Sequence, residues 1–233
     1  MEVYITKIND IDLTKINLIT SSINSEKINE INNFFYKKDK IRSLIGEILV
    51  RTIIIERLKI NNEDIIIYKN KYGKPYLRGY PNFEFNLSHS GEYVVCAFDK
   101  NPVGIDIEKI KEFDFKEIAK NFFEVNELNY IINQDLSFQL SKFYEMWTLK
   151  ESYIKCCGYG LNIPLNSFCI KLDKLRDIKV FKNNKDMKYS FNLLDIELNY
   201  KLAICSSCKN FYLDVINLNQ NDLINKYFKL ISN

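Results

Sequence analysis

The stretch VGIDIEKI, residues 103–110, alternates apolar and non-apolar residues and carries two acids. Successive side chains of a β-strand point to opposite faces, so its valine and isoleucines should line one face while Asp106 and Glu108 share the other. Neighbouring carboxylates repel each other unless water, a shared proton or a cation relieves the repulsion. The stretch therefore predicts either a solvated strand face or a cation site.

Composition limits the classes of protein that this chain can represent. Its 233 residues are 46% hydrophobic, enough for one compact unit or two closely packed halves. The 33 Lys and Arg residues nearly balance 30 Asp and Glu residues, and a net charge of +3 argues against nucleic acid or an anionic membrane as partner. Because we find neither a membrane-spanning apolar run nor a signal-peptide pattern, we expect a cytoplasmic protein.

The cysteine and histidine content limits the kinds of metal site that this chain can form. The six cysteines fit reduced thiols, and the CxxC of Cys205 and Cys208 lacks the second pair or nearby histidine that a zinc site requires. His89 is the only histidine, which excludes a site built from several imidazoles. Any metal site should therefore use carboxylates.

The order of predicted elements indicates an α+β fold. Apolar spacing predicts long helices over 32–58 and about 140–157, and two shorter ones over 115–123 and 124–134. Strand-like runs occupy 63–70, 83–99, 103–108, 167–172, 189–194, 200–207 and 211–218. We expect two similar subdomains, 1–102 and 103–233, related by pseudo-twofold symmetry, each a helix packed on an antiparallel sheet.

The second long helix contains another candidate pair. In SKFYEMWTLKESYIKCCGYGL, residues 141–161, Glu151 and Lys155 lie four residues apart and within reach of each other. An ordinary surface pair of this kind contributes about 0.2–0.5 kcal/mol, but the aromatic neighbours indicate a face that is not simply solvated. If this helix packs beside the strand, Asp106, Glu108 and Glu151 converge as the oxygen ligands that Mg²⁺ prefers.

Candidate phosphate ligands lie in the first half. GKPY places Lys74 on a loop, and NLSHSG places Ser88 and His89 at a strand end before a glycine. Ammonium, hydroxyl and imidazole groups suit an anion. Hydroxyls at a hairpin also form turns and a lone histidine can be structural, so the residues alone leave both interpretations open.

Taken in order, these motifs resemble a known family. GKPY, FNLSHSGEYVVCAFD, VGIDIE, FF(x)3E at residues 122–127 and W(T)LKES(Y)IK(x)2GYGL are similar to the 4′-phosphopantetheinyl transferases of the Sfp type, in the holo-acyl-carrier-protein synthase superfamily. The resemblance extends from KIRSLIGEILVR to IPLNSF, nearly the whole chain. It implies an Mg²⁺-dependent enzyme that moves the phosphopantetheine arm of coenzyme A onto a serine of an apo carrier protein, as in the activation of nonribosomal peptide synthetases for antibiotic biosynthesis.

The resemblance also implies residue roles. Asp106, Glu108 and Glu151 would hold Mg²⁺, with Glu151 or a metal-bound water accepting the serine proton, and Lys155 would balance charge on the leaving pyrophosphate. The implied coenzyme A ligands are Lys27, Arg42, Lys74, Ser88, His89 and Lys155. Glu30 stands where the family's second basic residue near the N-terminus is expected, so the resemblance leaves the detail of 3′-phosphate binding open.

A monomer is expected, with a peptidyl, acyl or aryl carrier protein docking near Gly158–Lys185. One alternative is a synthase serving fatty-acid synthesis, but those chains are about half as long and form trimers. Another is a noncatalytic coenzyme A or nucleotide-binding protein of the same fold, against which the intact acids and Lys155 argue. A nucleic-acid module is a third, disfavoured by the weak net charge.

Overall fold

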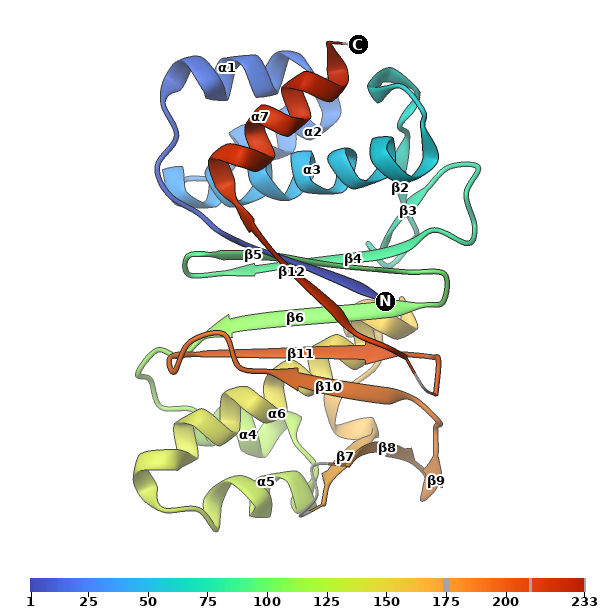
Figure 1. Cartoon of the computed structure of the whole chain (residues 1–233). Coiled ribbons are helices and arrows are strands. Elements are labelled where there is room, and N and C mark those ends of the chain that lie inside the picture. Colours follow the sequence, from blue (N-terminus) through green and yellow to red (C-terminus); the bar gives the residue numbers. More distant parts are fainter. Residues whose placement is uncertain (174–176, 210, 233) are drawn as a thin grey trace.

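A computed structural model describes residues 1–173, 177–209 and 211–232. Two sheets lie face to face, and each carries helices on its outer side (Figure 1). We call the part with the first sheet the upper half. Its strands run in the order β12 (Asp214–Asn219), β1 (Glu2–Lys7), β5 (Tyr93–Asp99) and β4 (Glu84–Ser90). β1 pairs with β12 in parallel, and the other pairs are antiparallel.

Helices cover the outer side of the upper sheet (Figure 1). They are α1 (Leu13–Ser21), α2 (Ser25–Asn32), the long α3 (Lys37–Leu58) and α7 (Gln220–Ile231). After α3 comes a short 3₁₀ turn, η1 (Asn62–Asp64), and a hairpin of β2 (Ile67–Lys69) and β3 (Pro75–Leu77). This hairpin extends from the upper half beside β4.

The lower half repeats the helix-on-sheet arrangement. Its antiparallel sheet has the order β10 (Ser190–Leu194), β11 (Tyr200–Ser206) and β6 (Val103–Lys109). The helices are α4 (Lys116–Phe122), α5 (Val125–Ile132) and the long α6 (Leu136–Cys157). Beyond α6 lie η2 (Gly160–Asn162), η3 (Leu165–Ser167) and a small sheet of β7 (Cys169–Leu172), β8 (Ile178–Lys182) and β9 (Lys185–Asp186).

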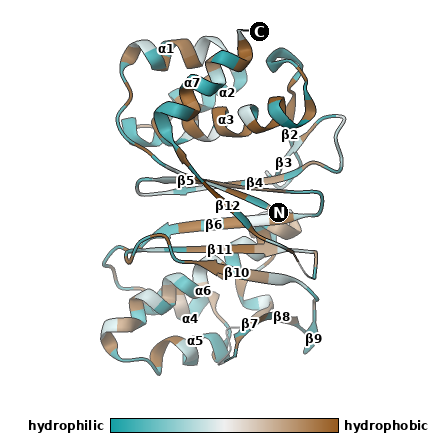
Figure 2. Cartoon of the chain, viewed as in Figure 1, coloured by the Kyte–Doolittle hydropathy of each residue, from teal (hydrophilic) through white to brown (hydrophobic). Residues whose placement is uncertain are grey.

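Buried apolar side chains of the described residues form three clusters stacked through the molecule. One fills the space between the upper sheet and its helices, and one lies between the lower sheet and α6. The third lies between the two sheets and draws Val3 and Val95 from above and Ile105 and Ile204 from below. Hydrophobic colouring along β11 and much of α3 follows this layering (Figure 2). The halves are therefore joined by a continuous apolar interface.

The α+β prediction is confirmed, and both long helices are present. α6 begins at Leu136, earlier than expected. The sequence patterns predicted a loop where β3 lies and did not predict β1, α1, α2, β8, β9 or α7. The last strand and helix pack on the upper half, where β12 pairs with β1 and Tyr227 of α7 is fully buried. The division into 1–102 and 103–233 stays a prediction. Among the described residues, we find no helix that combines the length and the apolar character needed to cross a membrane.

Candidate active site

Strand β6 forms with the alternation that its sequence predicts. Val103, Ile105 and Ile107 belong to the apolar cluster between the sheets. Asp106 and Glu108 lie on the opposite face, where they meet side chains from β4 and α6. Asp106 is only 4% exposed. The two acids are therefore not part of a freely solvated strand face.

Side chains of β4 hold the upper half to β6. The NLSHS segment places a polar side chain at every second position of β4, and these side chains accept hydrogen bonds from the backbone of β6, which otherwise lies at an edge of its sheet. The bonds run from Ile105 N to Asn86 Oδ1 at 2.9 Å, from Ile107 N to Ser88 Oγ at 3.3 Å and from Lys109 N to Ser90 Oγ at 3.0 Å. Sequence reasoning missed this role, although the period of two in NLSHS was its signal.

A glycine allows α6 to approach β6. A Cβ atom on Gly104 would lie 2.0 Å from the carbonyl oxygen of Ser152 and 2.4 Å from the nitrogen of Cys156. Both are helix backbone atoms, so any larger residue would force the helix away from the strand. This close approach brings the C-terminal turns of α6, with Glu151 and Lys155, to the acids of β6.

The centre of the site is an ion pair between α6 and β6. Lys155 Nζ lies 2.6 Å from Asp106 Oδ1 and also donates to Ser88 Oγ at 3.2 Å and to the carbonyl of Ile105 at 3.3 Å. Ser88 Oγ in turn donates to Asp106 Oδ1 at 3.0 Å. Ser88, Asp106 and Lys155 therefore come together here. Glu108, which accepts from Ser90, follows on the same face of β6 and is the fourth predicted site residue in this region.

The remaining two acids are held in an environment that disfavours their charge. Burial, and then the negative charge of Asp106, raise the pKa of Glu151 to about 7. Burial and Asp106 also raise the pKa of Glu108, although Ser90 Oγ donates to Glu108 Oε2 at 2.8 Å and favours the ionised form. The negative charge of Asp106 thus acts on both Glu108 and Glu151.

The donor atoms suit a divalent cation, but they are not arranged around one. Within the described residues, no three His, Cys, Asp or Glu side chains are grouped to hold a metal ion. Asp106 Oδ2 is nevertheless buried and finds no hydrogen-bond partner among the described residues. An oxygen of this kind, beside two acids with raised pKa values, fits an added cation. In this structure Lys155 supplies the positive charge beside Asp106.

Basic residues gather near the exposed side chain of His89. Partial desolvation, and then the charges of Arg42, Lys155 and Lys27, lower the pKa of His89. Arg42 donates to the carbonyl of Gly91 at 2.7 Å and to Asp39, while its buried Nε has no partner among the described residues. Positive charges and an unused donor in one region favour binding of an anion.

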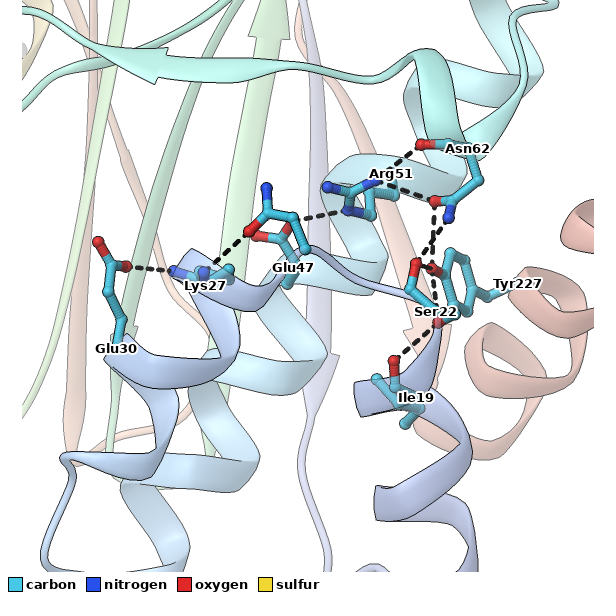
Figure 3. Close-up of polar contacts among 9 residues, drawn as sticks. Ile19, Ser22, Lys27, Glu30, Glu47, Arg51, Asn62 and Tyr227 are labelled. Atoms are coloured by element: carbon cyan, nitrogen blue, oxygen red, sulfur yellow. Dashed lines mark hydrogen bonds and ion pairs between the residues drawn. The ribbon is translucent and has the colours of Figure 1, made fainter.

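Lys27 and Glu30 lie at a cavity of the upper half. Figure 3 shows the contact of Lys27 with Glu30. Lys27 Nζ lies 3.2 Å from Glu30 Oε2, and Glu30 Oε1 accepts from Lys69 Nζ at 2.6 Å. These three side chains line a cavity of about 550 Å³ between α2, α3, the β2–β3 hairpin and β4. Asn86 and Leu87 of β4 form part of its wall. Glu30 thus forms ion pairs with two lysines beside the strand that carries Ser88 and His89.

Lys74 does not join the carboxylate cluster. Its side chain is buried, and its ammonium donates to the carbonyls of Val103 and Cys156, each at 3.2 Å. Glu84 Oε2 lies 3.3 Å away and supplies the opposite charge. The ammonium is thus fully engaged within the protein, and the predicted contact with the adenylate part of coenzyme A stays a prediction.

The segment after α6, expected to dock a carrier, divides into exposed and packed residues. Leu161 is 74% exposed, whereas Tyr159 also packs against the ring of Tyr72. Ile163 is partly buried against the lower core, and Leu165 is buried within it. Residues 174–176 of this segment lie outside the described residues. Among the described residues of this segment, Leu161 is the most exposed large apolar residue.

A second buried ion pair anchors α6 from its other side, and sequence reasoning assigned it no role. Lys150 Nζ lies 2.6 Å from both oxygens of Glu127 and donates to the carbonyl of Phe168 at 2.9 Å. Glu127 also accepts from the nitrogens of Glu124 and Ile170, at 2.9 Å and 2.7 Å. Because every charge is satisfied, the pair ties α5, α6 and β7 together. Its signals were the acid of FF(x)3E and the lysine before Glu151.

Comparison with known proteins identifies the family. The sequence profile of the N-terminal part of 4′-phosphopantetheinyl transferases matches residues 12–101, and that of the 4′-phosphopantetheinyl transferase superfamily matches residues 102–205. The chain belongs to the 4′-phosphopantetheinyl transferase family.

Bacterial relatives place it with the Sfp type within that family. It is 41% identical over 198 residues to the 4′-phosphopantetheinyl transferase gsp of Aneurinibacillus migulanus, covering 85% of this chain and 82% of that protein. It is 35% identical over 204 residues to Sfp of Bacillus subtilis, covering 88% and 91%. A solved holo-(acyl-carrier-protein) synthase of Bacillus anthracis is 16% identical, with a TM-score of 0.38 over 45% of this chain and 92% of that one.

Proposed function

We propose that this protein transfers the 4′-phosphopantetheine arm of coenzyme A to a serine of an apo carrier protein and releases adenosine 3′,5′-bisphosphate. The observation that carries the proposal is the meeting of Asp106 and Glu108 of β6 with Glu151 and Lys155 of α6 in a member of this family. Three acids and a lysine are the groups needed for substitution at a phosphoryl centre, where negative charge must be neutralised and a proton removed.

The three carboxylates would hold Mg²⁺. When bound, the ion would neutralise charge on the pyrophosphate of the donor. Asp106 Oδ2 is buried without a partner among the described residues, and burial and then the charge of Asp106 raise the pKa values of Glu108 and Glu151, an effect that Lys155 only partly offsets. Lys155 would then share Asp106 with the ion and stay near the leaving group.

The transfer exchanges one oxygen–phosphorus bond for another. The carrier's serine oxygen forms a bond to the phosphorus that bears the pantetheine arm, and the bond from that phosphorus to the bridging pyrophosphate oxygen breaks. The leaving adenosine 3′,5′-bisphosphate takes the electron pair of the broken bond. The serine proton passes to the carboxylate of Glu151 as the general base, or to a water beside it.

The positive charges around His89 support binding of the donor, coenzyme A, in this region. His89, Arg42 and Lys27 would bind phosphate oxygens of coenzyme A, and Ser88 would contribute its hydroxyl from the same strand. The charges of Arg42 and Lys27 both act on His89, and Arg42 Nε is a buried donor without a partner among the described residues. The cavity of about 550 Å³ adjoins this strand and offers room for part of the donor.

The carrier would approach the exposed loop after α6. Leu161, 74% exposed, follows directly from the helix that carries Glu151 and Lys155. A docking surface within Gly158–Lys185 would therefore place the incoming serine near the acids. The monomeric state, the cytoplasmic location and the kind of carrier, peptidyl, acyl or aryl, stay predictions from the sequence.

The test is incubation of the protein with coenzyme A, Mg²⁺ and a panel of apo carrier proteins, with the mass of each carrier read before and after. We expect a carrier to gain the mass of one phosphopantetheine group, and none to gain it when the carrier serine is replaced by alanine. Binding of coenzyme A without any mass gain would contradict the proposal and favour a noncatalytic coenzyme A-binding protein.

A further inference from the structure

The hairpin of the upper half contacts the C-terminal end of α6 in the lower half. Asn70, in the turn between β2 and β3, donates its Nδ2 hydrogen to the carbonyl of Gly158 at 2.8 Å. Lys74, in the same turn, donates to the carbonyl of Cys156 at 3.2 Å. A Cβ atom on Gly160 would lie 3.0 Å from the carbonyl oxygen of Tyr72, so the two loops also touch through their backbones.

These bonds fall where a helix needs donors. The last four carbonyls of an α-helix have no partner within the helix and carry the negative end of its dipole, so donors and cations there are favourable. Gly158 caps α6 after Cys157: it has φ of 75° and donates to the carbonyl of Ile154 at 3.0 Å. The carbonyls of Cys156 and Gly158 receive their donors from the hairpin.

Lys74 also connects the helix to the strand of the acids. Its ammonium donates to the carbonyl of Val103, at the start of β6, as well as to that of Cys156. The side chain is 4% exposed, and an ammonium is buried only where hydrogen bonds and an opposite charge, here Glu84, compensate the lost hydration. The cation therefore lies between the end of α6 and the beginning of β6.

These contacts lie close along the chain to the groups proposed to act in the transfer. Cys156 follows Lys155 directly, and Val103 lies three residues before Asp106. We propose, on the basis of the proposed transfer function, that Asn70 and Lys74 are positioning residues that hold the end of α6 against the start of β6 and so keep Lys155 at Asp106. We call these bonds the α6 clasp. In this role Lys74 acts through the helix, which differs from the adenylate contact implied by the family resemblance.

A single substitution removes one bond of the clasp and preserves its turn. Asn70 Oδ1 accepts from the nitrogens of Tyr72 and Lys74, at 2.9 Å and 3.0 Å, and Asn70→Asp keeps this acceptor while losing the donor to Gly158. We expect kcat to fall about tenfold, because small displacements of reacting groups are costly. The KM for coenzyme A should change less than twofold, and the amides of residues 155–158 should exchange hydrogen faster.

Lys74 is tested without leaving a buried charge unpaired. Lys74→Met combined with Glu84→Gln removes both members of that ion pair, and we expect the same fall in kcat with little change in the KM for coenzyme A. The matched control is Lys71→Met, which removes an exposed lysine from the same turn and should leave kcat, KM and exchange unchanged.

Unchanged kcat and unchanged exchange in Asn70→Asp would overturn the clasp. A tenfold rise in the KM for coenzyme A with unchanged kcat in the Lys74 variant would also overturn it and support an adenylate contact instead. If the unsubstituted protein transfers nothing to any carrier, the proposed function fails. Hydrogen exchange then still decides the clasp, because faster exchange at 155–158 supports it and unchanged exchange contradicts it.

Discussion

The long helices of the two halves contain the same pair of charges but use it differently. α3 and α6 are each 22 residues long, and each carries an acid followed four residues later by a base. In α3 the two charges bind each other, because Arg51 Nε donates to Glu47 Oε1 at 2.7 Å (Figure 3). In α6 the base Lys155 binds Asp106 of the neighbouring strand at 2.6 Å.

The difference originates in the strand that each helix covers. β5 presents apolar residues such as Val94 and Cys96 to α3, so its ion pair is completed within the helix and by Asn62, which accepts two bonds from Arg51 at 3.0 Å each. β6 instead presents Asp106, which binds Lys155, while burial and then the charge of Asp106 raise the pKa of Glu151. The strand beneath each helix therefore decides whether the base stays paired within the helix or binds a neighbouring element.

The largest effect should follow from removing the competing acid. Asp106→Asn preserves the shape of the side chain but loses the charge, and we expect transfer to fall below detection while the protein stays folded. Mass spectrometry of the carrier and circular dichroism measure the two results. Glu117→Gln, at an exposed position of α4, is the matched control and should retain full activity. Full activity in Asp106→Asn, or in EDTA, would rule out the magnesium site.

Breaking the pair of α3 should affect stability. Arg51→Met leaves the carboxylate of Glu47 buried without its partner, which costs about 3–5 kcal/mol of unfolding free energy. Urea unfolding measures the loss. The double variant Glu47→Gln, Arg51→Met removes both charges and should recover most of it. Equal stability of the single and double variants would mean that the α3 pair is as solvated as an ordinary surface pair.

Substitution of Glu151 should have a smaller effect on stability, and it should stabilise the protein where Arg51→Met destabilises it. Its pKa, raised from 4.5 to about 7, means that the folded, metal-free protein prefers the protonated acid and loses stability as the pH rises through this range. Glu151→Gln should therefore raise Tm at pH 8 in EDTA by about 2–4 °C. At pH 4, where the acid is protonated, the gain should vanish. A lower Tm for the variant at pH 8 would show that ionised Glu151 has a favourable partner.

The smallest effect concerns the carrier. Leu161→Ala should raise the KM for the carrier several-fold, with the KM for coenzyme A and Tm unchanged, because the side chain is 74% exposed. Leu13→Ala, on α1 of the other half and also 74% exposed, serves as the control and should change neither constant. A drop in Tm with equal effects on both substrates would assign Leu161 to packing instead of docking.

Local patterns were sufficient to predict several parts of this protein. Alternation in VGIDIE gave a strand with both acids on one face, and apolar spacing gave both long helices, because periods of two and 3.6 follow from backbone geometry alone. The resemblance to the family also came from the sequence alone, because it rested on short motifs and their order along the chain. β1, α1, α2 and α7 were missed, and β1 and α7 are stabilised by partners far away in the chain, such as β12 and the upper core.

Only the tertiary structure decided which groups meet. Lys155 could have paired with Glu151 at helix spacing, but Gly104 lets α6 approach β6 so closely that Asp106 takes the lysine. Lys74 looked like a free loop cation and is instead buried between two backbone carbonyls. Spacing along one element fixes the directions of its side chains, whereas burial and partners depend on which distant elements pack against it.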